Sequence, residues 1–134
     1  MILGIGNDMV NIRRIEAMIS RYGDRFIKRI FTEIERAQSN NRSLRVESYA
    51  KRFAAKEACA KALGTGLSEG VFWRDMGVIN LPSKQPILNL TGGAEFALAK
   101  MLPKGYTSQV NLTISDDFPW AQAIVIISCV PSVC

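Results

Sequence analysis

The stretch that decides the fold is residues 52–66, which read Arg52-Phe53-Ala54-Ala55-Lys56-Glu57-Ala58-Cys59-Ala60-Lys61-Ala62-Leu63-Gly64-Thr65-Gly66. So many alanines are typical of a helix that its neighbours pack against closely. The glycines that follow Leu63 predict where this helix ends. The segment is therefore the last part of the longest predicted helix, which spans residues 43–63.

Three charged side chains interrupt this apolar helix, at Lys56, Glu57 and Lys61. Glu57 and Lys61 are four residues apart and share a helix face. One interpretation is a surface ion pair worth about 0.3–0.5 kcal/mol. The other is a metal-binding carboxylate beside an ammonium group that handles phosphate, with glycines that let a ligand approach the backbone. The residues alone leave both interpretations open.

Outward from this helix, the N-terminal residues 2–10 are apolar and predict a strand that carries Gly4-Ile5-Gly6-Asn7-Asp8. Asp8 is either a site residue at the end of this apolar run or a capping residue for the next helix. The two glycines are not a dinucleotide-binding fingerprint, because a third glycine and a β-α-β context are missing.

The remaining pattern alternates between helical and strand periodicity. Ile12, Ile15, Ile19 and Tyr22 form the predicted core stripe of the first helix, and Thr32 with Glu35 predicts a capping box. Helices are predicted at 12–22, 24–31, from Thr32 onward, 43–63 and 94–102, and strands at 2–10, 77–81, 86–90, 106–115 and 121–130. This order predicts one α+β domain, residues 1–134, with helices packed on a largely antiparallel sheet.

The composition excludes several kinds of site. The 134 residues contain no histidine, which removes Ser–His and Cys–His nucleophile pairs. Cys59, Cys129 and Cys134 form no Cys-x-x-Cys pair, so a zinc site is not expected and a reducing cytoplasm is the expected location. Cys134 is expected to be mobile and open to intermolecular disulfides. A bound metal should rest on carboxylates, which favours Mg²⁺, with Mn²⁺ as the alternative.

Positive charge gathers in one part of the chain. Residues 12–56 hold twelve Lys or Arg and five Asp or Glu, whereas the remainder holds five and seven. This imbalance indicates an anionic partner: nucleic acid, a membrane surface, a phosphorylated small molecule or an acidic protein. Arg14, Met18, Arg21 and Arg25 share the helix face opposite the core stripe, which suits docking of an acidic helix and equally suits a solvated face.

Two motifs together carry a resemblance to a known family. The motifs are Gly4-Ile5-Gly6-x-Asp8-x-Val10-x-Ile12-x-Arg14-Ile15 and the stretch from Arg52 to Gly66. In order and spacing the chain resembles the holo-acyl-carrier-protein synthases, which are bacterial-type 4′-phosphopantetheinyl transferases. The resemblance implies the fold of the 4′-phosphopantetheinyl transferases. It also implies transfer of the phosphopantetheine arm of coenzyme A to a serine of apo acyl carrier protein, for fatty acid biosynthesis. Adenosine 3′,5′-bisphosphate would be released.

The resemblance also implies roles for single residues. Asp8 and Glu57 match the family's magnesium ligands, and with Lys61, which lies near the transferred phosphate, they form the expected catalytic set. The expected coenzyme A contacts are Arg52, Lys61, Gly64, Thr65 and Gly66. The expected docking residues for the acidic carrier protein are Arg14, Met18, Arg21 and Arg25. The family also implies a homotrimer. No membrane insertion is expected, because no apolar run approaches the roughly 18–20 residues of a membrane helix. No nucleic acid partner is expected either.

One position departs from the family. Asp116 stands where many members have histidine, and it is interpreted as a turn residue before Phe118-Pro119. The base that takes the serine proton is a carboxylate or a metal-bound water, and we favour the water because Asp8 and Glu57 are assigned to the metal. Two rival functions are a nucleic-acid-binding module, for which the basic segment lacks interleaved aromatic residues, and an inactive carrier-binding protein with the same fold.

Overall fold

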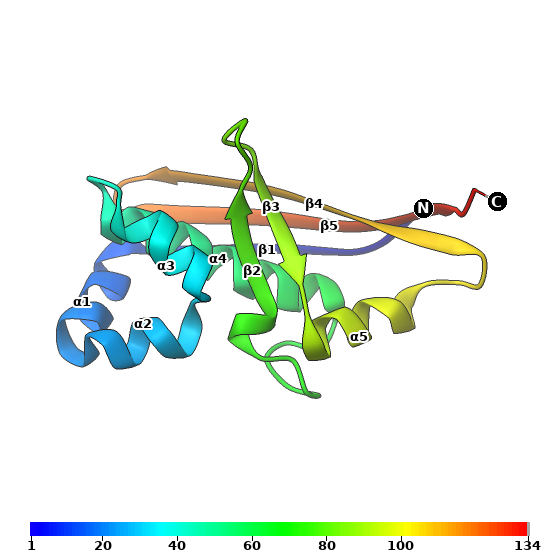
Figure 1. Cartoon of the computed structure of the whole chain (residues 1–134), viewed down its shortest axis with the longest axis horizontal. Helices are drawn as coiled ribbons and strands as arrows, with labels where there is room; N and C mark the ends of the chain where they lie inside the picture. Colours follow the sequence, from blue (N-terminus) through cyan, green and yellow to red (C-terminus); the bar gives the residue numbers. More distant parts are fainter. Residues whose placement is uncertain (134) are drawn as a thin grey trace.

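The computed structural model describes residues 1–133, so the prediction about Cys134 lies outside the described residues. The predicted helices and strands follow one another in the predicted order, and one short 3₁₀ helix that was not predicted lies between the fourth helix and the second strand (Figure 1). The helices are α1 (Ile12–Tyr22), α2 (Asp24–Ile30), α3 (Glu33–Asn40), α4 (Arg45–Leu63), the short 3₁₀ helix η1 (Trp73–Asp75) and α5 (Gly92–Met101). The strands are β1 (Ile2–Asn11), β2 (Met76–Asn80), β3 (Pro86–Leu90), β4 (Tyr106–Asp117) and β5 (Trp120–Pro131).

The strands form two antiparallel sheets. The larger has the order β1-β5-β4, so the first strand of the chain pairs with the last. The smaller is the β2–β3 hairpin, in which Met76 pairs with Leu90 and Asn80 with Pro86. The α+β class with antiparallel pairing is confirmed, although the sheet is divided in two. None of the helices within residues 1–133 combines the length and apolar character needed to span a bilayer.

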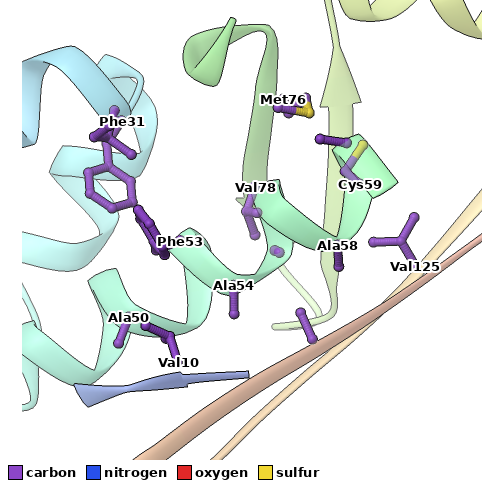
Figure 2. Packing of buried hydrophobic residues seen from close by; sticks show 14 of the residues in the cluster. Val10, Phe31, Ala50, Phe53, Ala54, Ala58, Cys59, Met76, Val78 and Val125 are labelled. Carbon is purple, nitrogen blue, oxygen red and sulfur yellow. The ribbon is translucent and has the colours of Figure 1, made fainter. Parts of the chain in front are cut away.

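Helix α4 lies between the two sheets and forms the centre of the core (Figure 1). Its alanines are almost fully buried, and Ala54 and Ala58 point toward the larger sheet while Met76 and Val78 of β2 lie on the other side (Figure 2). Small side chains let the helix lie close to the strands, as their abundance predicted. A 19-residue helix buried on both sides holds its charged residues in fixed directions.

Two glycines of β1 make the contact with α4 unusually close. A Cβ atom on Gly6 would lie 1.8 Å from the Ala58 carbonyl oxygen, and one on Gly4 would lie 2.1 Å from the Ala62 carbonyl oxygen. Side chains alternate along a strand, so Gly4, Gly6, Asp8 and Val10 face the helix. Ile5 and Met9 face away and are 64% and 57% exposed.

Several local predictions are confirmed, and others are wrong at particular residues. The Thr32 capping box of α3 is present, and Gly23 ends α1. Tyr22 does not belong to the core stripe: it is 45% exposed, because α1 packs through Ile12 and Ile15 near its start. Asp116 is a strand residue rather than a turn residue, because β4 runs on to Asp117, which pairs with Trp120.

Candidate active site

Asp8 lies on the helix-facing side of β1, in line with Gly6. The missing side chains at Gly4 and Gly6 allow α4 to approach β1, and this brings the last turns of the helix beside Asp8. The Asp8 side chain is 18% exposed, and its Oδ1 lies 3.2 Å from the Lys61 Nζ. Lys61 also donates a hydrogen bond to the Asn7 carbonyl, at 2.9 Å.

Glu57 joins this cluster from the turn of α4 before Lys61. Burial raises the pKa of the Glu57 carboxyl, and the negative charge of Asp8 raises this pKa further. The positive charges of Lys61 and Arg14 act in the opposite direction. Residues from β1, α1 and α4 therefore act on one carboxyl group, and Asp8 lies near enough for its negative charge to raise the pKa of Glu57.

This geometry contradicts one of the two interpretations of the Glu57/Lys61 spacing. Within residues 1–133, Lys61 makes its ion pair with Asp8, a residue 53 positions away, rather than with Glu57. The interpretation as a simple i, i+4 surface pair is therefore wrong. Glu57 is left as a carboxylate whose ionisation is costly, a condition that a bound cation would relieve.

The carboxylate pair fits a magnesium ion. Within residues 1–133 no three His, Cys, Asp or Glu side chains gather as a metal site, so the protein offers two carboxylates here. Mg²⁺ is commonly held by one or two carboxylates together with substrate phosphates and water. The mutual repulsion of Asp8 and Glu57 is the kind of electrostatic cost that a divalent cation offsets.

A groove lined by arginines and aromatic residues lies next to the carboxylates. Arg14 belongs to both places, since its charge acts on Glu57 and its guanidinium lies 5.8 Å from the centre of the Phe53 ring. The first part of the groove, about 210 Å³, is lined by Arg14, Ile15, Met18, Phe26, Arg29, Ile30, Phe53 and Trp73. The adjoining part, about 420 Å³, is lined by Met18, Tyr22, Arg25, Phe26 and Arg29. We call both parts together the arginine groove.

The structure places three of the four expected docking residues in the arginine groove. Arg14, Met18 and Arg25 line it, whereas the Arg21 guanidinium lies 5.3 Å from the centre of the Tyr22 ring. Met18 is half-buried and not the exposed methionine that the helix face predicted. Arg29 also lines the groove but was not among the predicted docking residues, although it lies four residues after Arg25 and so on the same side of α2.

The segment Gly64-Thr65-Gly66 leaves α4 as an exposed loop. Gly64 has φ +80° and Gly66 has φ +60°, a backbone conformation that side chains with Cβ disfavour. The Gly66 N–H donates to the Ala60 carbonyl, which closes the helix end. The loop starts three residues after Lys61 and therefore lies close to the carboxylate cluster. Its contact with coenzyme A stays a prediction.

Arg52, one of the expected coenzyme A contacts, is buried between α3 and α4. It is 2% exposed, and its guanidinium donates hydrogen bonds to the Ser39 hydroxyl at 3.0 Å and to the Gln38 side chain at 3.3 Å. Its N–H groups point into the contact between α3 and α4, because Arg52 lies on the same side of α4 as Lys56 and this side faces α3. In this structure Arg52 holds two helices together, and its contact with coenzyme A stays a prediction.

Asp116 also has a partner that the sequence analysis missed. Its carboxylate lies 3.0 Å from the Lys51 ammonium of α4, with both side chains about one quarter exposed. The pair lines a pocket of about 260 Å³ together with Arg42, Ser43, Leu44, Glu47 and Ser48. Asp116 therefore ties the end of β4 to α4.

Comparison with known proteins shows close relatives over nearly the whole chain. The family described as "4'-phosphopantetheinyl transferase superfamily" matches residues 4–122. The holo-[acyl-carrier-protein] synthase of Mesorhizobium japonicum is 63% identical over 131 residues, which are 98% of this chain and 96% of that protein. The protein of the same name from Rhizobium rhizogenes is 62% identical and is covered to 98% on both sides.

Solved structures share the fold as well. The holo-[acyl-carrier-protein] synthase of Neisseria meningitidis has a TM-score of 0.84 at 34% identity, over 96% of this chain and 99% of that one. The Helicobacter pylori enzyme in complex with coenzyme A has a TM-score of 0.78 at 28% identity, over 92% and 99%. With the carboxylate pair of β1 and α4 in place, these matches show that the chain belongs to the holo-acyl-carrier-protein synthase family of 4′-phosphopantetheinyl transferases.

Proposed function

We propose that this protein transfers the 4′-phosphopantetheine group of coenzyme A to a serine of an apo acyl carrier protein and releases adenosine 3′,5′-bisphosphate. The carrier proteins of fatty acid biosynthesis are the proposed acceptors. The observation that carries the proposal is the meeting of Asp8, Glu57 and Lys61 in a chain of this family. Coenzyme A is supported as the donor by its presence in the related structure from Helicobacter pylori.

The reaction exchanges the phosphoanhydride bond of coenzyme A for a phosphate ester of the serine. The serine oxygen attacks the phosphorus that bears the pantetheine arm, and the bond from that phosphorus to the bridging pyrophosphate oxygen breaks. Negative charge then grows on the departing bisphosphate. Phosphoryl transfer of this kind depends on positioning and on charge stabilisation, which are the contributions that this cluster can make.

Each residue of the cluster has a proposed task. Asp8 and Glu57 would hold a magnesium ion, which when bound supplies positive charge to the pyrophosphate. The Lys61 side chain is 54% exposed, so its ammonium can leave Asp8 and donate a hydrogen bond to the departing phosphate oxygen. With both carboxylates assigned to the ion and no histidine in the chain, the serine proton passes to water.

The arginine groove is the proposed docking surface for the carrier protein. Its cationic rim of Arg14, Arg25 and Arg29 surrounds an apolar floor that includes Met18 and Phe26. A rim of one charge sign around apolar contacts selects a partner with an acidic surface and an apolar spot. Because Arg14 also acts on Glu57, a carrier bound here would have its serine near the carboxylates.

The homotrimer is also proposed, on the basis of the larger sheet. Ile5 and Met9 on β1 face away from α4 and stay exposed in the single chain, as does Trp120 at the start of β5. Exposed apolar side chains on one sheet face are a common basis for subunit contact. Light scattering with wild-type protein and with Ile5→Lys tests this, since three copies are expected for the first and fewer for the second.

A transfer assay tests the proposed function. Purified protein is incubated with apo acyl carrier protein, coenzyme A and Mg²⁺, and the carrier is then weighed by mass spectrometry. The carrier should gain the phosphopantetheine mass with the wild-type protein and not with Glu57→Gln. A carrier that keeps its mass with wild-type protein would support an inactive carrier-binding protein, and retention of RNA or DNA on filters at about 0.15 M salt would support the nucleic-acid rival.

A further inference from the structure

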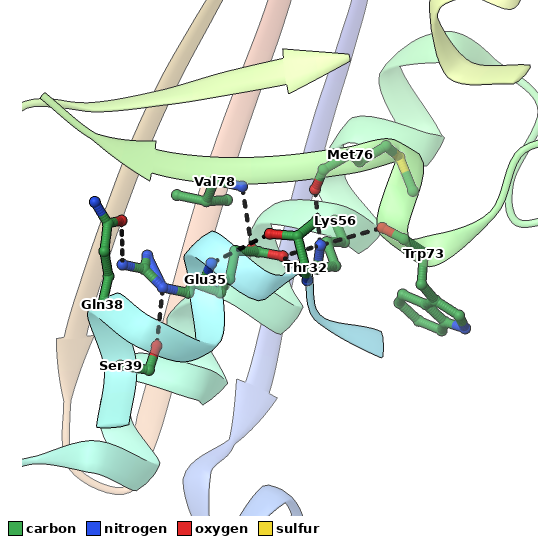
Figure 3. A network of polar contacts seen from close by, with 9 residues as sticks. Thr32, Glu35, Gln38, Ser39, Lys56, Trp73, Met76 and Val78 are labelled. Atoms are coloured by element: carbon green, nitrogen blue, oxygen red, sulfur yellow. Dashed lines mark hydrogen bonds and ion pairs between the residues drawn. The ribbon is translucent and has the colours of Figure 1, made fainter. Parts of the chain in front are cut away.

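The mechanism leaves one buried pair of charged residues unused. The Lys56 ammonium of α4 lies 2.6 Å from the Glu35 carboxylate of α3, and neither side chain is exposed to solvent. Lys56 also donates to the carbonyl oxygens of Met76, at 2.8 Å, and Trp73, at 3.1 Å (Figure 3). All three N–H donors of the ammonium are therefore used.

The Glu35 side of this network is equally complete. One carboxylate oxygen accepts hydrogen bonds from Lys56 and from the Thr32 N–H, and the other accepts from the Val78 N–H, at 3.0 Å (Figure 3). Replacement of a buried ion pair by apolar residues is often neutral or stabilising, so stability alone does not explain such a pair. A fully satisfied network does fix the relative positions of the segments that it joins.

One of these segments forms a wall of the arginine groove. While the Trp73 carbonyl is bound by Lys56, the Trp73 ring stacks on Phe53 with ring centres 5.0 Å apart. Both rings line the groove together with Arg14. Loss of the Lys56 hydrogen bond would therefore free the backbone of a residue whose side chain shapes the docking surface.

The other end of the connection is the catalytic carboxylate. Glu57 directly follows Lys56, and successive residues of an α-helix are rotated by about 100° around its axis. Lys56 therefore points to α3 and β2, whereas Glu57 leaves the helix on another side, where the charge of Asp8 acts on it. A rotation of α4 that breaks the contacts of Lys56 also moves Glu57.

We propose that Lys56 and Glu35 are positioning residues, which hold the Trp73 wall of the arginine groove in a fixed place relative to Glu57 so that a bound acidic carrier protein presents its serine to the carboxylates. The proposal rests on the proposed function of the arginine groove. It predicts a defect in use of the carrier protein with normal use of coenzyme A. A role in folding alone would not separate the two substrates.

The first test is the double variant Glu35→Gln/Lys56→Met, which removes both charges together. Its KM for apo carrier protein should rise about tenfold and its kcat should fall about tenfold, whereas its KM for coenzyme A should change less than twofold. The control is Tyr49→Phe, which removes a different hydrogen bond between α4 and α3, from Tyr49 to Asn40, and should keep wild-type constants. Unchanged kcat and carrier KM in a folded double variant would overturn the proposal.

A second variant keeps the proposal testable if the double variant does not fold. Trp73→Ala removes the groove wall at a half-buried position and should raise the carrier KM about tenfold with the coenzyme A KM unchanged. Where the double variant folds, Glu35→Gln/Lys56→Met combined with Trp73→Ala should be little worse than either change alone, because both changes act on the same wall. A normal carrier KM in Trp73→Ala would overturn the inference, and so would effects on the carrier KM that multiply fully in the combined variant. Transfer activity in the wild type would still uphold the proposed function in either case. An inactive wild type would overturn both.

Discussion

Replacement of Gly6 by alanine should force β1 away from α4 and disable the site. The added Cβ would lie 1.8 Å from the Ala58 carbonyl oxygen, 2.8 Å from the Ala58 carbonyl carbon and 2.9 Å from the Ala62 nitrogen. All three atoms belong to the backbone of a buried helix, so no side chain can turn aside. Because real Cβ contacts stay above 3.0 Å, the strand and the helix must separate by at least about 1.2 Å.

This displacement has two measurable effects. Overpacking of a core typically costs about 1–3 kcal/mol, and a clash with rigid backbone should reach the upper part of that range. Asp8 follows Gly6 by two residues on the same strand face, so it moves away from Glu57 by a similar distance. A misplacement of about 1 Å at a reacting centre can lower activity about 100-fold.

Urea denaturation and the carrier transfer assay measure the two effects separately. Gly6→Ala should lose about 2–3 kcal/mol in the free energy of unfolding and about 100-fold in kcat/KM under conditions where it is folded. The matched control is Gly77→Ala, at another strand glycine, where the nearest atom to the new Cβ is the Thr32 methyl group at 3.3 Å. Near-wild-type stability and turnover in Gly6→Ala would refute the view that close contact of β1 and α4 assembles the carboxylate pair.

Three further predictions concern the charged residues. Glu57→Gln should lower transfer at least about 100-fold. In metal-free wild type, the stability that protonated Glu57 contributes is complete below its unfolded pKa and is lost as pH rises through its raised native pKa. Denaturation at pH 7 should therefore find Glu57→Gln at least as stable as the metal-free wild type. Lys61→Met should lower kcat about 100-fold, with a change of no more than about 1 kcal/mol in unfolding free energy because its pair with Asp8 is partly exposed. Arg14→Glu should raise the carrier KM at least about tenfold but not that for coenzyme A, and added salt should raise the wild-type carrier KM; equal effects on both substrates would exclude Arg14 from docking.

Much of the fold was predictable because its signals are local. The core stripe of α1 at Ile12 and Ile15, the Thr32 capping box and the glycine after Leu63 depend on residues within one or two helical turns of each other. Strand ends were less predictable, since the length of β4 depends on pairing with β5 across the hairpin. The α+β class follows from such local patterns, whereas the division into two sheets does not.

The candidate site was likewise predictable in part. Asp8, Glu57 and Lys61 could be named from two motifs, whereas the pairing of Lys61 with Asp8 depends on contact between β1 and α4. The groove residues Trp73 and Phe53 come from separate segments and carry no motif of their own. Their meeting depends on how η1 packs against α4.

The sequence by itself determined which elements form and which carboxylates and arginines this protein can use, because periodicity, caps and motif spacing are properties of neighbouring residues. Only the tertiary structure decided which charges of α4 are buried. Lys56 and Lys61 lie on the same helix, yet one is enclosed with Glu35 and the other is half exposed beside Asp8. The physical reason is that burial and ion pairing depend on the elements that surround each face of the helix, and here the carboxylate partners of Lys56 and Lys61 lie 21 and 53 positions away.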